Sequence, residues 1–148
     1  MLHSIIIPCY KSSKTIRKVV EMTAAELERL NIHEYEFVLV DDYSPDDGAT
    51  LEELKSLARD YSFVKAISLA KNSGQHNAVM AGLNYASGEL LIAMDDDMQT
   101  HPSQLKYLLA EIEKGYDIVY GYYPQKKHSG FRNFGSFLNY ITVRILIG

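Results

Sequence analysis

The stretch ELLIAMDDDMQTHP, residues 89–102, contains the apolar run Leu90–Met94 followed directly by Asp95, Asp96 and Asp97. A short apolar run between polar residues predicts a buried strand, here over 89–94. Pro102 is suited to the first turn of a helix, and an amphipathic pattern follows it. Adjacent carboxylates about 4 Å apart repel by roughly 4 kcal/mol per pair at an effective dielectric of about 20. The strand, acidic loop and helix therefore predict a site for positive charge.

The same alternation of strand and helix extends upstream of this stretch. Apolar runs predict strands over 2–8, 35–40, 63–70, 89–94 and 116–121, and amphipathic patterns predict helices between them. Ser12 or Ser13 is the expected N-cap of the first helix, and Gly88 the expected stop of the third. Such alternation predicts an α/β fold, a three-layer α/β/α sandwich with a mainly parallel sheet.

Composition excludes several classes of protein. The chain has 148 residues and a net charge of −4, as expected for one globular α/β domain. Its dense basic cluster is confined to 126–128, so we expect no nucleic-acid partner. Cys9 is the single cysteine and cannot form an internal disulfide, which favours a reducing, cytoplasmic location.

Polar side chains follow several of the predicted strands. Pro8, Cys9 and Tyr10 end the first, Asp41 and Asp42 the second, and the acidic triplet the fourth. In open α/β sheets, ligands bind beyond the carboxyl ends of the strands. These positions therefore predict a binding site.

The spacing of Asp95, Asp97 and Gln99 points to a metal. Two carboxylates and an amide oxygen are hard ligands suited to Mg²⁺ or Mn²⁺, whose shell substrate phosphates can complete. The spacing also resembles the start of an EF-hand loop. However, Thr100 stands where that loop needs glycine, and Lys106 where it needs glutamate, so calcium sensing is not expected.

Three segments together resemble a known enzyme family. SIIIPCYK, VLVDDYSPDDGAT and LAKNSGQHNAVMAGLNYASGELLIAMDDDMQTHP are similar to the family 2 glycosyltransferases of GT-A fold, in order from about residue 3 to about 120. The similarity is greatest to the branch that moves a sugar from a nucleotide onto a polyprenyl phosphate. The resemblance implies that residues 1–121 form a nucleotide-sugar-binding GT-A core.

The resemblance also implies roles for individual residues. Pro8 and Tyr10 would line the base and ribose pocket, and Asp42, beside Asp41, would read the nucleobase edge. The triplet Asp95-Asp96-Asp97 would be the DXD motif. In it, Asp95 would face the ribose or sugar, while Asp97, also the candidate catalytic residue, and Gln99 would hold a metal on the diphosphate.

The chain departs from the family pattern at several positions. Ser12 stands where a glutamate is common, Tyr43 where glycine or asparagine is common, and Asp96 where alanine is common. An arginine often found near Tyr122 is missing, and Arg132 or Lys126–Lys127 could replace it. We expect Tyr43 to alter the base pocket, and Asp96 to contact the metal or a backbone donor.

Each site assignment has a structural alternative. Asp41 and Asp42 could be turn-forming residues, and the triplet a solvated loop. Tyr10 could be a packing aromatic. Asn72 and Gly74 are expected to shape the turn before the third helix, and Cys9 to be a small core residue. His76, His101 and His128 are expected to be surface or packing residues, because none has a companion at metal-ligand spacing.

The resulting hypothesis is a metal-dependent, inverting glycosyltransferase that uses a nucleotide-diphosphate sugar and a polyprenyl phosphate acceptor at the cytosolic face of a membrane. One alternative is a family 2 enzyme with a polysaccharide or other soluble acceptor. Another is a non-catalytic phospho-acceptor signalling module, but such modules place acids after the first strand, where this chain has PCYK.

Residues 122–148 are expected to form a loop and an amphipathic helix, the start of a truncated acceptor or membrane-proximal region. Apolar residues recur there at helical spacing: Phe131, Phe134, Phe137, Leu138, Ile141 and Ile145. Such a helix would contact a membrane surface or missing core, and promote homo-oligomers. A piece ending at Gly148 would bind nucleotide and metal without efficient transfer to a lipid.

Overall fold

A computed structural model of the chain describes residues 1–121 and the strand at 141–144. The strands are β1 (His3–Cys9), β2 (Tyr35–Asp41), β3 (Val64–Ser68), β4 (Leu90–Ala93), β5 (Ile118–Tyr120) and β6 (Ile141–Arg144). The α-helices are α1 (Ile16–Arg29), α2 (Ala49–Asp60), α3 (Gln75–Tyr85) and α4 (Leu105–Glu113), the last preceded by a 3₁₀ turn, η1 (Pro102–Gln104). The predicted strands up to residue 121, and the helices between them, are therefore confirmed. The strand bounds differ from the predicted ones by at most two residues at either end.

The strands form one sheet in the order β3-β2-β1-β4-β6-β5. β1 pairs in parallel with β2 on one side and β4 on the other, and β2 pairs in parallel with β3. β6 is antiparallel to both of its neighbours, β4 and β5. The sheet is thus mainly parallel, as predicted, and the strand order reverses at β1 and β4.

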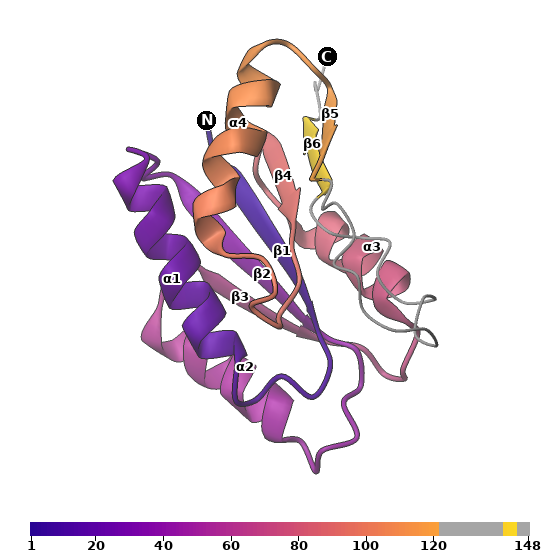
Figure 1. Cartoon of the computed structure of the whole chain (residues 1–148). Helices are drawn as coiled ribbons and strands as arrows, with labels where there is room; N and C mark the ends of the chain where they lie inside the picture. The colour runs from indigo at the N-terminus through magenta and orange to yellow at the C-terminus, as the bar shows by residue number, and fades with distance from the viewer. Residues whose placement is uncertain (122–140, 145–148) are drawn as a thin grey trace, which may run out of the picture.

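Helices cover both faces of the sheet, which confirms the predicted three-layer arrangement (Figure 1). Ile5 and Ile7 of β1 pack in the larger core with residues of α1, α2 and α4. The alternate residue Ile6 faces the other way, into a smaller core with Ala78 of α3. This alternation follows from the two-residue period of a strand.

α3 lies very close to the sheet. A Cβ placed on Gly82 would lie 2.5 Å from Ile6 Cγ2 and 3.2 Å from Val40 Cγ2. The small residues of this helix therefore allow the close approach that the sequence predicted.

Two predicted helix boundaries are wrong. α1 begins at Ile16 after Thr15, and the hydroxyl of the expected cap Ser12 contacts Asp96 and Tyr10 instead. α3 ends at Tyr85, before Gly88. Gly88 instead allows a close approach to the N-terminal strand, because a Cβ there would lie 2.7 Å from the Leu2 carbonyl oxygen.

The helix expected in the C-terminal segment is wrong for residues 141–144, which form β6 between β4 and β5. Ile141, Thr142 and Val143 are β-branched, and such residues favour strands that can pair on both sides. The other members of the predicted apolar face lie outside the described residues, as do His128, Arg132 and the 126–127 lysines. Among the described residues, no helix is both long and apolar enough to span a bilayer.

Candidate functional site at the carboxyl edge of the sheet

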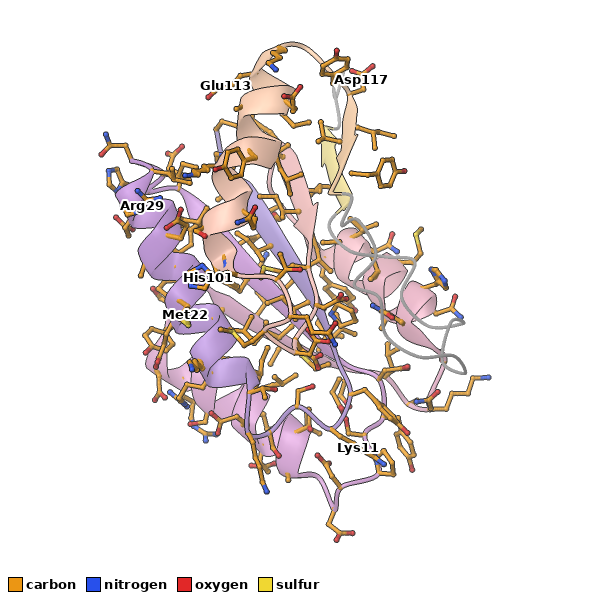
Figure 2. All side chains as sticks on the ribbon, in the orientation of Figure 1. Lys11, Met22, Arg29, His101, Glu113 and Asp117 are labelled. Atoms are coloured by element: carbon orange, nitrogen blue, oxygen red, sulfur yellow. The ribbon has the colours of Figure 1, made fainter. Side chains whose placement is uncertain are left out.

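The predicted site residues meet at one edge of the sheet, where β1, β2 and β4 end. The Asp42 N–H donates to the Cys9 carbonyl at 3.0 Å, and the Met94 N–H donates to the Ile6 carbonyl at 3.0 Å. Lys11, in the loop after β1, lies at the opposite end of the molecule from Asp117, which precedes β5 (Figure 2). This edge adjoins the point where the strand order reverses, a usual place for ligands in such sheets.

Asp95 is a half-buried carboxylate surrounded by like charge. Its Oδ1 accepts a hydrogen bond from Gln75 Nε2, at the start of α3, at 2.9 Å. Burial, followed by the charges of Asp97 and Asp96, raises its pKa to about 6, although the Gln75 contact opposes this. A nearby cation would favour the ionised form of the Asp95 carboxyl and so lower its pKa again.

Asp97 and Gln99 are exposed beside Asp95. Asp97 Oδ1 accepts from the Gln99 backbone N–H at 3.0 Å, which folds the loop back at this point. Within residues 1–121, no three His, Cys, Asp or Glu side chains are grouped to hold a metal ion. The candidate oxygen donors remain Asp95, Asp97 and the amide of Gln99, a chemistry that suits Mg²⁺ or Mn²⁺.

Asp96 is directed away from these donors, toward the loop after β1. Its Oδ2 accepts from the Tyr10 backbone N–H at 3.2 Å and from the Ser12 hydroxyl. Burial raises its pKa, and the Ser12 and Tyr10 hydrogen bonds oppose the rise. The expected contact with a backbone donor is present, while direct contact with substrate stays a prediction.

Asp41 and Asp42 are both buried and serve different loops. Asp41 Oδ1 accepts from the backbone N–H of Ser44 at 3.1 Å and from its hydroxyl at 2.6 Å, so the turn-forming alternative holds for Asp41. Asp42 accepts from the backbone N–H groups of Ser73 at 2.7 Å and Gly74 at 2.9 Å. It thereby holds the turn before α3, and its base-reading role stays a prediction.

The remaining predicted residues lie on the first loop. Pro8 is buried in β1, in register with Val40. Tyr10 is 48% exposed, which argues against a packing role, and Lys11 Nζ lies 5.6 Å from its ring centroid. Cys9 is a buried core residue, as expected, and burial raises the pKa of its thiol.

Backbone strain occurs in the loops after all three strands. Lys11, Tyr43 and Met98 have φ angles of 58°, 53° and 60°, a left-handed conformation that is uncommon for residues with a Cβ. Such residues often cluster at functional sites, where the surrounding structure holds them.

The sequence did not predict the side chains that join the loops. The sequence pattern places Gln75 in a helix and Ser12 at a helix N-cap, where the family often has glutamate, and it gives Ser44 no role. The Asp-x-x-Ser spacing of Asp41 and Ser44 is a local signal that could have identified one contact. Gln75 and Ser12 contact residues 20 and 84 positions away, for which the sequence offers no local signal.

Comparison with known sequences agrees with this geometry. The family described as "Glycosyl transferase family 2" matches residues 4–143. The chain belongs to this family. It is 38% identical over 133 residues to the undecaprenyl-phosphate 4-deoxy-4-formamido-L-arabinose transferase of Proteus mirabilis, covering 90% of the chain and 40% of that protein. The enzyme of the same name from Pseudomonas fluorescens is 38% identical over 141 residues, covering 95% and 41%. The chain thus spans about two fifths of these relatives.

Solved structures agree on the fold of this family 2 chain. Staphylococcus aureus TarS residues 1–349 align with a TM-score of 0.61 and 29% identity, over 80% of the chain and 34% of TarS, and TarS has also been solved with UDP. Mannosyl-3-phosphoglycerate synthase from Rubrobacter xylanophilus aligns with a TM-score of 0.66 and 22% identity, over 89% and 44%. The fold is that of the GT-A glycosyltransferases.

Proposed function

We propose that this chain carries the nucleotide-sugar site of an inverting, divalent-metal-dependent transferase that moves a sugar onto a polyprenyl phosphate. The observation that carries the proposal is the meeting of Asp95 and Asp97 with Tyr10 and Asp42 at one edge of the sheet, in a family 2 glycosyltransferase. The relatives' name supports a polyprenyl-phosphate acceptor, and the solved TarS–UDP complex supports a nucleotide donor.

The donor would lie across the carboxyl edge. The exposed Tyr10 ring offers an apolar face to the base or ribose, and the loop held by Asp42 borders the same space. Asp95, Asp97 and Gln99 would hold Mg²⁺ or Mn²⁺ beside the diphosphate. A mannosyltransferase of the same fold has been solved with GDP-mannose and Mn²⁺.

The reaction is a single in-line displacement. An oxygen of the acceptor phosphate forms a bond to the anomeric carbon, while the bond from that carbon to the diphosphate oxygen breaks and its electron pair leaves with the nucleoside diphosphate. The configuration at that carbon is therefore inverted. A phosphate acceptor is already anionic at neutral pH, so it needs little help from a general base. When bound, the divalent cation supplies charge neutralisation for the leaving diphosphate.

The carboxylates alone would repel the donor. A diphosphate near Asp95 and Asp97 meets like charge. Among residues 1–121, none of the ion pairs includes a carboxylate of the acidic triplet, so no basic side chain there neutralises it. We therefore expect UDP or GDP to bind only with Mn²⁺ or Mg²⁺. Asp97→Asn should weaken this binding at least about tenfold.

Isothermal titration calorimetry with UDP and GDP, with Mn²⁺ or with EDTA, tests this expectation. Asp117→Asn is the matched control, because Asp117 is also exposed but lies at the other end of the molecule (Figure 2). Equal affinity with and without metal, or an unchanged affinity in Asp97→Asn, would refute the metal assignment.

The acceptor requires a separate assay. Transfer of radiolabelled sugar by this chain to undecaprenyl phosphate in detergent should be slow, as expected from the sequence, but should exceed transfer to a soluble oligosaccharide. The reverse order would favour the alternative of a soluble or polysaccharide acceptor. A lipid acceptor would put the proposed reaction at the cytosolic face of a membrane.

A further inference from the structure

Hydrogen bonds join the loops at the carboxyl edge into a closed circuit, which we call the loop network. The loop after β1 contacts the loop after β2 through the Lys11 N–H and Ser44 Oγ, at 3.0 Å. Asp42 holds the turn before α3, where Gln75 donates to Asp95. Asp96 completes the circuit, because it joins the acidic triplet back to the loop after β1.

From this circuit we propose that Asp96 is a positioning residue that couples the cation donors Asp95 and Asp97 to the Tyr10–Ser12 loop, and so to the nucleoside. The proposal rests on the proposed function, since it assumes that Tyr10 faces the nucleoside. It assigns Asp96 no contact with the reacting atoms.

The position of Asp96 in the chain makes this coupling direct. It lies between the two cation donors, so a backbone shift that adjusts Asp95 or Asp97 also moves Asp96. Its carboxylate is paired with the loop after β1, whereas Asp95 accepts from Gln75 and Asp97 accepts from the Gln99 N–H within its own loop. Two donors of that loop, the Tyr10 N–H and the Ser12 hydroxyl, contact the same carboxylate oxygen, so the connection does not depend on a single hydrogen bond.

The Tyr10–Ser12 loop is itself fixed by hydrogen bonds, so a change at Asp96 alters its position. Ser12 is 2% exposed, and its N–H donates to Thr50 Oγ1 at 2.9 Å. Thr50 Oγ1 donates in turn to Asp46 Oδ2 at 2.5 Å. This second hydrogen bond fixes the Thr50 side chain at the start of α2. The Tyr10 N–H is shared between Ser12 Oγ, at 2.9 Å, and Asp96 Oδ2, at 3.2 Å.

Two contacts thus orient the backbone that carries the exposed Tyr10 ring. Loss of the Asp96 carboxylate leaves the Ser12 hydroxyl without this acceptor and frees one side of the Tyr10 N–H. The Tyr10 loop would then be less well placed for the nucleoside, while Asp95, Asp97 and Gln99 keep their oxygens for the cation and diphosphate.

This separation defines the test. In calorimetry with Mn²⁺, Asp96→Ala should weaken UDP or GDP binding about tenfold, a coupling of ordinary size for linked sites. Binding of inorganic pyrophosphate with Mn²⁺ should change less than about twofold. A residue needed only for folding would weaken both ligands together. Asp96→Asn keeps an acceptor oxygen and should recover most of the lost affinity.

Ser12→Ala gives an independent check. It removes the partner hydroxyl, so it should weaken the same nucleoside diphosphate, and the double variant with Asp96→Ala should lose no more than the larger single effect. Asp117→Asn should change none of these affinities. Thermal unfolding of each variant should show that it is folded at the temperature of the titrations.

The outcomes separate this proposal from the proposed function. If the unmodified chain binds neither UDP nor GDP with Mn²⁺, the proposed function fails. If it binds, but Asp96→Ala binds nucleotide as well as the unmodified chain, the positioning role is refuted. Equal losses for nucleotide and pyrophosphate would also refute it, since Asp96 would then act in the cation site or in folding. Additive losses in the double variant would refute the Ser12 connection.

Discussion

At the scale of single residues, the Asp95 carboxylate that we propose binds the cation also lowers the stability of the fold. Its pKa rises from an ordinary value of 3.8 to about 6 because of burial, then Asp97, then Asp96. Between these pH values the folded protein holds a proton that the unfolded chain has lost. Folding is therefore destabilised as the pH rises from 3.8 to 6, and the full cost remains above pH 6.

Asp95→Asn should remove this cost. The asparagine is neutral and keeps an oxygen that can accept from Gln75. We expect the variant to be more stable than the unmodified chain above pH 6 by on the order of 1 kcal/mol, a figure reduced for the solvent exposure of the group. Urea unfolding in EDTA, at several pH values between 4 and 7.5, measures the difference.

The gain should grow through the window from pH 4 to 6 and then level off. Addition of Mn²⁺ should stabilise the unmodified chain and not the variant. A variant that is less stable at every pH would mean that the carboxylate itself is needed for the fold.

At the scale of elements, the packing of α3 depends on one glycine. Gly82 faces Ile6 and Val40, with no room for a methyl group. In an exposed helix, Gly→Ala stabilises by about 1 kcal/mol. Here we expect Gly82→Ala to destabilise by about 1–3 kcal/mol, because the helix or the β1 side chain must move.

Chemical denaturation measures this change, with Asn84→Ala as the control. Asn84 is exposed on the same helix, so its replacement by a better helix former should be neutral or slightly stabilising. A more stable Gly82→Ala protein would show that α3 can move away from the sheet without cost.

The elements that the sequence predicted correctly are those with strong local signals. The apolar runs of β1 and β2 and the periodic patterns of α1 and α2 specify their own structure. The helix predicted over Ile141–Arg144 is wrong, because this segment is a strand through its pairing with β4 and β5. β4 lies about 50 positions earlier in the chain. Pairing over such a distance leaves no periodic signal in a short segment.

At the scale of the whole molecule, the site was predicted as a set of strand ends but not as a network. The topology rule brought Tyr10, Asp42 and Asp95 to one edge without any knowledge of side chains. The partners of Asp96 depend on loop conformations that include left-handed residues such as Lys11 and Met98. Loop details of this kind are set by the packed fold, so a linear pattern could not specify them.

The sheet itself supplies the last prediction, because β6 lies inside it and not at its edge. Val143 is in register with Leu91 of β4 and with Ile118 of β5. Proline at this position removes an N–H from a strand that is paired on both sides, and its ring interferes with the ladder. Val143→Pro should therefore lower the free energy of unfolding of the whole domain by at least about 1–3 kcal/mol.

The matched control is Val143→Thr, which keeps the backbone N–H and the β-branched shape, so it separates the loss of the ladder hydrogen bond from the change of side chain. Urea unfolding followed by circular dichroism reports on the whole domain, and hydrogen exchange of the β4 and β5 amides reports on the neighbouring strands. Because β5 reaches β4 only through β6, its amides should lose protection first and most. An unchanged midpoint, with β5 still protected in Val143→Pro, would mean that β6 is dispensable for the sheet.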